Sequence, residues 1–160
     1  MSIAVRAIVK PGTVLEAMTK LGLAPGDKRD LLDQIGIGLA ENTRLRFSDG
    51  VSPDGEAWVQ SLRAKLQGGE TMRDTGALMN SISHFVGTDF VEVGTNIPYG
   101  PWLHFGAVIQ AKNGEYLRFR VPGGAWASKR EVTLPARPWL GISEDDEEEI
   151  VDIITAFLAP

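Results

Sequence analysis

The chain has 160 residues, of which 43% are hydrophobic and 23% are charged, as expected for one folded domain with a core of its own. It contains no cysteine, which excludes disulfide bonds, thiolate zinc sites and cysteine nucleophiles and fits assembly in a reducing cytoplasm. The first ten residues lack the apolar run of a signal peptide, and no stretch approaches the roughly 18 apolar residues that span a bilayer. We therefore expect a cytosolic protein without membrane contact.

The net charge of −5 is unevenly distributed, because the last 18 residues contain seven acids and no Lys or Arg. The rest of the chain carries 16 basic and 14 acidic residues and is nearly neutral. Bulk charge therefore gives no argument for nucleic-acid binding, and it predicts one acidic segment at the C-terminal end.

The N-terminal segment predicts one strand and one short helix. Polar and apolar residues alternate over 3–9, which is typical of a half-buried strand, and Pro11-Gly12 closes it. Residues 13–21 predict a short helix with Thr13 as its N-cap.

A long amphipathic helix is predicted over 27–47, because apolar residues recur there at helical spacing. Its apolar stripe consists of Leu31, Ile35, Leu39 and Leu45. Turn signals at 48–50 and 52–55 end the helix. A second, weaker helix is expected over 58–66.

The middle of the chain predicts short elements separated by turns. A helix of one or two turns is expected over 77–82, followed by a hairpin with strands at 83–86 and 90–94. The segment 99–105 is rich in aromatic residues and is expected to form a loop.

A second hairpin is predicted between 108–111 and 116–121, because Asn113-Gly114 is the strongest short hairpin signal in the chain. The glycine-rich and basic stretch 122–131 is then expected to be an exposed loop.

The last helix begins after Ser143, which is expected to be its N-cap, and acidic residues in its first turn suit the helix dipole. Its expected buried stripe consists of Ile150, Ile153, Ile154, Phe157 and Leu158.

These elements predict an α+β fold, with a mostly antiparallel sheet of hairpins packed against a long helix in the N-terminal half and a C-terminal helix. We expect one domain over 1–160, with an extended arm or loop at 107–134.

Few residues indicate chemistry. His84 and His104 have neither a partner at i+4 nor a nearby pair of carboxylates, so we interpret both as structural. Gly36 and Gly38 lie within the helix pattern, which indicates close packing rather than a dinucleotide loop. We therefore predict no catalytic residue, cofactor or metal. The alternative is a small hydrolase that uses His104 with Asp74 or Glu92.

Two charged segments are the candidate interface. The basic and aromatic residues are Arg118, Arg120, Trp126, Lys129 and Arg130, and the acidic residues are Glu147, Glu148 and Glu149. Opposite charges on one chain suit a contact between identical subunits. A solvated start of the last helix is the alternative for the acids, and a nucleic-acid-binding module around Trp126 is the alternative for the bases.

Four blocks of sequence, taken in order, resemble the phage virion morphogenesis family of Mu-like phages, which is related to tail completion proteins. The blocks are RFSDG at 46–50 with PDGEAW at 53–58, DTGAL at 74–78 with SI at 81–82, VEVGT at 91–95 through FG at 105–106, and PARPWLGIS at 135–143. The resemblance covers roughly residues 28–158. Where the family commonly reads Tyr-Ala and then His-Gln-Phe-Gly, this chain has Tyr99-Gly100 and His104-Phe105-Gly106.

The resemblance implies a non-enzymatic structural protein of a tailed phage, located in the virion and in the host cytoplasm during assembly. It implies a ring of identical chains, a hexamer or a dodecamer, in the neck or at the head-proximal end of the tail. The implied role is tail completion and head-tail joining, with a tail terminator ring as the alternative. The implied partners are other phage neck and tail proteins, with DNA passing through the ring lumen without sequence-specific binding.

Overall fold

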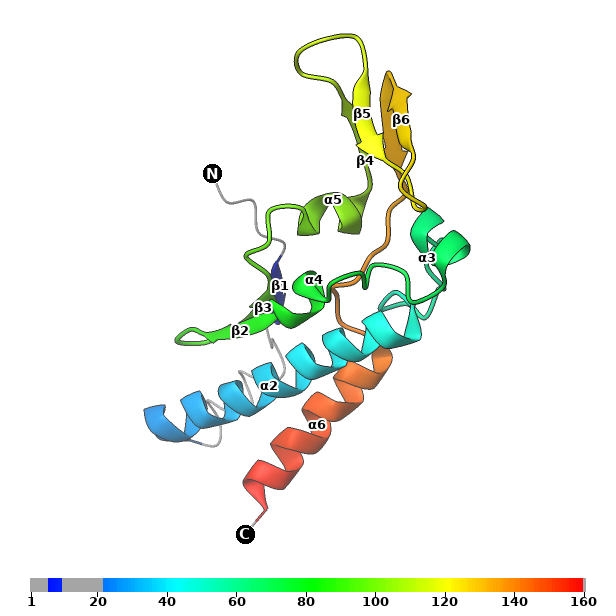
Figure 1. The fold of residues 1–160 in the computed structure, drawn as a ribbon. Coiled ribbons are helices and arrows are strands. Elements are labelled where there is room, and N and C mark those ends of the chain that lie inside the picture. Colours follow the sequence, from blue (N-terminus) through cyan, green and yellow to red (C-terminus); the bar gives the residue numbers. More distant parts are fainter. Residues whose placement is uncertain (1–5, 10–21, 160) are drawn as a thin grey trace.

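The computed structural model describes residues 6–9 and 22–159 (Figure 1). The helices are α2 (Pro25–Asp49), α3 (Leu62–Gln67), α4 (Ala77–Asn80), α5 (Gly100–Phe105) and α6 (Glu144–Leu158). The strands are β1 (Arg6–Val9), β2 (Ser83–Val86), β3 (Val91–Gly94), β4 (Ala107–Gln110), β5 (Leu117–Arg120), β6 (Trp126–Lys129) and β7 (Glu131–Leu134). Antiparallel strand pairs and the two long helices confirm the predicted α+β fold. The helix predicted over 13–21 lies outside the described residues.

Helix α2 is the predicted long helix. Pro25 stands in its first turn, where the missing N–H leaves no intrahelical bond unmade, and Gly50 follows its last residue with a φ of +69°. The sequence places Leu45 in the buried stripe, but this side chain is 52% exposed. Thr43 and Phe47 are buried in its place, because they continue the spacing of the earlier apolar positions.

Helix α2 lies between a three-stranded antiparallel sheet and α6, and it packs against both (Figure 1). The sheet has the order β1-β3-β2, and its β2–β3 pair confirms the first predicted hairpin. Two glycines allow the close approach that the sequence predicts. A Cβ on Gly36 would lie 2.5 Å from the ring of His84, and one on Gly38 would lie 2.8 Å from the carboxylate of Glu149.

The aromatic part of the core joins α2 to two segments that are distant in sequence, one around Trp58 and one around Trp139. Phe47 contacts Trp58 and Trp139, with ring centroids 5.5 and 6.0 Å apart. The indole of Trp58 donates to the carbonyl of Pro138 at 2.8 Å. The prediction of a helix over 58–66 is therefore wrong at its start, because Trp58 is not helical and packs in the core. Helix α3 begins only after Ser61, which caps it.

The aromatic segment 99–105 was predicted to be a loop, and this prediction is wrong. The segment contains the short helix α5. Pro101 suits the first turn of that helix. The helix turns His104 toward Trp139, with ring centroids 5.8 Å apart, and leaves Trp102 and Phe105 exposed.

Strand pairing between 107 and 134 differs from the prediction. The segments around Asn113-Gly114 do not pair with each other, because β4 pairs with β7 and β5 pairs with β6. A turn closes the β5–β6 hairpin, where the N–H of Val121 donates to the carbonyl of Ala125 at 2.9 Å. The stretch 122–131, predicted as a loop, therefore contains strand β6. Within the described residues, none of the helices is both long and apolar enough to cross a bilayer.

Candidate assembly interface

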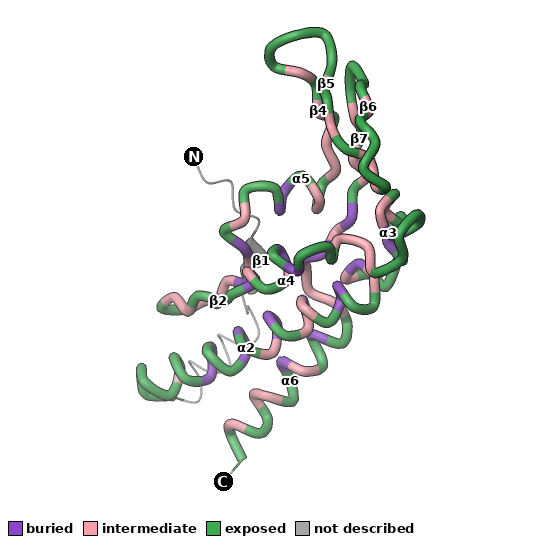
Figure 2. Tube along the Cα trace, in the orientation of Figure 1, coloured by how far each residue is buried: buried purple, intermediate pink, exposed green. Residues whose placement is uncertain are grey.

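Residues 107–134, which we call the arm, hold strands β4 to β7 and extend from the rest of the molecule (Figure 1). Gly106 leads into the arm with a φ of +75°, and a Cβ there would lie 2.9 Å from the carbonyl oxygen of Leu134. Every residue of the arm is half-buried or exposed (Figure 2). Isolated two-stranded pairs are marginally stable in water. An arm without a buried side chain therefore has little internal stabilisation of its own.

One face of the β5–β6 hairpin, which we call the cationic face, carries three predicted interface residues. Arg120 lies opposite Trp126 in the strand register, and Arg118 lies opposite Ser128. The guanidinium of Arg120 is 5.2 Å from the centroid of the Trp126 ring, and that tryptophan is 66% exposed. Alternation along β5 places Arg118 and Arg120 on one face, as the sequence predicts, and the pairing of β5 with β6, which it does not predict, adds Trp126.

The other two predicted basic residues lie elsewhere on the arm. Arg130 lies between β6 and β7, 5.8 Å from the ring centroid of Tyr116 and 3.6 Å from the carboxylate of Glu115. Lys129 lies opposite Leu117 in the register, so it is on the reverse face of the hairpin from Arg118. The five predicted residues therefore do not form one surface. Three lie on the cationic face, Lys129 lies on the reverse face, and Arg130 lies between β6 and β7.

The reverse face of the hairpin borders a groove of about 640 Å³, which we call the arm groove. The arm contributes Phe119, Val121, Ala127 and Lys129 to it, together with residues of β7. The body contributes the segment before α3 and helix α3 itself, including Val59, Leu62 and Lys65. Sequence reasoning missed this groove, because it depends on the approach of segments about 60 residues apart.

The three predicted acids of α6 differ in their surroundings. Glu147 and Glu148 are exposed. Glu149 is half-buried and accepts a hydrogen bond from the side-chain amide of Asn42 on α2. The structure therefore leaves two of the three acids available to a partner and uses the third between its own helices.

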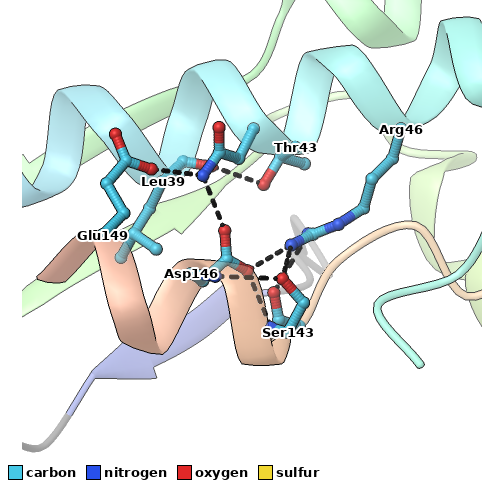
Figure 3. A network of polar contacts seen from close by, with 8 residues as sticks. Leu39, Thr43, Arg46, Ser143, Asp146 and Glu149 are labelled. Atoms are coloured by element: carbon cyan, nitrogen blue, oxygen red, sulfur yellow. Dashed lines mark hydrogen bonds and ion pairs between the residues drawn. The ribbon is translucent and has the colours of Figure 1, made fainter. Parts of the chain in front are cut away.

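A buried polar network at the start of α6 was missed from the sequence (Figure 3). Arg46 of α2 forms an ion pair with Asp146, and both side chains are buried. Arg46 also donates to the carbonyl of Gly141 at 3.1 Å and to the hydroxyl of Ser143 at 3.2 Å. Ser143 and Asp146 form a reciprocal capping box. This network fixes the start of α6 on α2 and thereby orients the acidic turn.

The groups considered for a hydrolase have other partners. The backbone N–H of Trp139 donates to Nδ1 of His104 at 3.3 Å, and burial lowers the pKa of His104 below its ordinary value of 6.5. Asp74 lies 3.5 Å from the guanidinium of Arg63. Glu92 lies on strand β3. In the part of the chain that the structure describes, no cluster of three or more His, Asp or Glu side chains suits a metal ion.

Comparison with known proteins agrees with the resemblance seen in the sequence. A family model described as the phage virion morphogenesis family matches residues 9–159. The chain is similar to the Mu-like prophage FluMu G protein 2 of Haemophilus influenzae, with 27% identity over 141 residues, 88% of this chain and 86% of that protein. No solved structure matches. The match to nearly the whole chain shows that it belongs to the phage virion morphogenesis family.

Proposed function

We propose that this chain is a non-catalytic structural protein that forms a ring in the neck or at the head-proximal end of a phage tail. Its role there is tail completion and head-tail joining. Membership of a virion morphogenesis family supports a structural role in the virion. The observation that carries the proposal is the arm, whose 28 residues include none that is buried although its faces are partly apolar. Such a segment gains stability when a partner covers it.

A ring of identical chains requires two different surfaces on each chain, one meeting the other on the neighbour. The basic residues on the two faces of the arm and the exposed acids Glu147 and Glu148 of α6 provide surfaces of opposite charge. Exposed ion pairs contribute only about 0 to 1 kcal/mol each, so their effect comes from repetition around the ring and from faster encounter. Trp126 adds an aromatic anchor of the kind that dominates many interfaces.

The ring is proposed to be a hexamer or a dodecamer that contacts other phage neck and tail proteins. Viral DNA passes through its lumen without sequence-specific binding. A tail terminator ring is the alternative position for the same assembly.

Electron microscopy of the purified chain, alone and mixed with phage tails, tests the proposal. We expect closed rings of six or twelve copies and density at the head-proximal end of the tails. Monomers at every concentration, together with no binding to tails, would contradict both the ring and its position.

A second candidate is a nucleic-acid-binding module, which the Arg120 and Trp126 pair favours because bases stack on aromatic and guanidinium planes. Fluorescence anisotropy with single-stranded and duplex DNA over a salt series tests it. Binding that weakens steeply with salt, and that Arg118→Gln with Arg120→Gln abolishes without affecting ring formation, would favour this candidate.

A further inference from the structure

We infer that the arm groove of one chain receives the exposed face of helix α6 from a second copy of the same chain. This inference rests on the proposed ring and specifies which two surfaces meet.

The groove is an apolar surface that stays open in the part of the chain that the structure describes. Val59 and Leu62 line it on the side of the body and are 56% and 55% exposed. Phe119 and Val121 line it on the side of the arm and are only half-buried. Large side chains of this kind in a concave site gain most when an apolar partner removes them from water.

The groove also carries unpaired positive charge. Lys65 and Lys129 both line it and are exposed. Among the residues that the structure describes, neither lysine has a carboxylate partner. The two arginines that line the groove differ from these lysines, because Arg63 binds Asp74 and the carbonyls of Glu70 and Arg73, and Nε of Arg137 donates to the carbonyl of Val59. The occupant should therefore be apolar in part and acidic in part, since like charges would be repelled.

Helix α6 presents a surface of this composition. Its inner side packs on α2 through the buried Ile150 and the half-buried Ile153. Its outer side carries Glu148, Val151 and Leu158 at helical spacing, with Val151 59% and Leu158 38% exposed. The last 18 residues contain no Lys or Arg, so nothing on this helix would repel the two lysines.

Helix α6 packs on α2 of its own chain and not on its own arm. The arm and the C-terminal end of α6 lie at opposite ends of the molecule (Figure 1). The start of α6 is fixed on α2 by the buried pair of Arg46 and Asp146. The contact must therefore join two copies through different surfaces, which is the heterologous arrangement that closes a ring.

Cysteine cross-linking tests the contact directly, because the chain contains no cysteine of its own. Lys129→Cys protein is mixed with Glu148→Cys protein and treated with a short bismaleimide. We expect cross-linked pairs that contain one copy of each variant. Asp89→Cys replaces Glu148→Cys in the control, because Asp89 is an exposed acid between β2 and β3, on the other side of α2 from α6. Yields no higher than in this control, or products joining two Lys129→Cys chains, would overturn the inference.

A pair of substitutions tests the apolar part of the contact. Val151→Lys should weaken self-association at least tenfold in sedimentation velocity, whereas Ile37→Lys on α2, at 54% exposure, should leave it unchanged. Equal behaviour of the two variants would overturn the inference. Charge exchange provides a rescue: Lys65→Glu with Lys129→Glu should weaken assembly, and Glu148→Lys with Asp152→Lys on the partner should restore it.

Failure of this inference is distinguishable from failure of the proposed function. Rings without the Lys129 to Glu148 cross-link would overturn the contact and leave the ring in place. A chain that stays monomeric while its α6 face binds another virion protein would overturn the second copy as the occupant. Absence of both rings and tail binding would overturn both proposals.

Discussion

Arg46 and Asp146 hold α6 on α2 through a buried ion pair. Arg46 is the first residue of the RFSDG segment, and Asp146 follows three residues after the PARPWLGIS segment. Removing one partner of such a pair leaves the other charge buried and unpaired, which typically costs about 3 to 5 kcal/mol. We expect Arg46→Met to lower the free energy of unfolding by about this amount, because the hydrogen bonds to Gly141 and Ser143 are lost as well. Urea denaturation followed by circular dichroism measures the change.

The control is the double variant Arg46→Met with Asp146→Asn, which removes both charges. The double variant should be more stable than the sum of the two single changes predicts, because it leaves no unpaired buried charge. Strict additivity would show that the two side chains do not depend on each other.

His104 is expected to make stability depend on pH. Burial lowers its pKa from the ordinary 6.5, and its Nδ1 must be unprotonated to accept from the N–H of Trp139. The unfolded chain therefore binds this proton more readily than the folded chain, so stability is present above pH 6.5 and is lost as the pH falls below it.

The measurement compares unfolding free energies of the wild type and His104→Gln at pH 7.5 and at pH 5.5. The wild type should lose more stability over this interval, because the variant retains all other titrating groups. Identical losses in the two proteins would show that protonation of His104 is not coupled to folding.

The predicted buried stripe of helix α6 contains both buried and exposed positions. Ile150 is 7% exposed, Ile154 is half-buried against the core, and Leu158 is 38% exposed. Ile150→Ala should therefore cost about 2 to 5 kcal/mol, whereas Leu158→Ala should cost about 0.5 kcal/mol or less. Thermal and urea melts of the two variants test this order, and equal losses would show that the helix packs differently.

Elements whose signals are local were predictable from the sequence. Helix α6 is one, because Ser143 and the apolar spacing after it specify its start and its face within a few residues. The β2–β3 hairpin is another, since a short loop leaves a strand little choice of partner.

Pairing and burial that depend on distant segments were not predictable. Asn113-Gly114 lies in a bend, but the strands on either side of it do not form the predicted hairpin, because β4 pairs with β7 and β5 pairs with β6. Arg46 was missed for a related reason, because helical periodicity assigns an arginine to the polar face unless its partner 100 residues later is known. Of the candidate interface, Arg118 and Arg120 share a face as alternation predicts, whereas the unpredicted register of β6 with β5 adds Trp126 to that face and places Lys129 at the groove.

Substitution of Trp126 tests whether the arm takes part in assembly. Its side chain is 66% exposed and makes no buried contact, so Trp126→Ala should leave the unfolding free energy nearly unchanged. It should weaken assembly by about 2 kcal/mol, roughly thirtyfold in the dissociation constant, as loss of an interface anchor does.

Sizing of the assembled particles and the yield of completed tails measure this effect. Phe85→Ala is the matched control, because Phe85 is 62% exposed on the β2 strand, away from the arm. Unchanged sizing and yield for Trp126→Ala would show that the cationic face has no role in assembly.

The acidic start of α6 should affect the rate of assembly more than the stability of the chain. Glu147 and Glu148 are exposed, so Glu147→Gln with Glu148→Gln should change the unfolding free energy by about 0.5 kcal/mol or less. Because opposite charges accelerate encounter and salt screens them, the double variant should assemble more slowly and with less salt dependence.

Glu149→Gln should behave differently and destabilise the chain itself, since Glu149 accepts from Asn42 within the subunit. Light scattering over a salt series measures the rates, and the control double variant is Asp30→Asn with Asp89→Asn, two exposed acids outside α6. If the two double variants assembled at the same rates at every salt concentration, the exposed acids of α6 would have no role in assembly and would only be a solvent-exposed start of the helix.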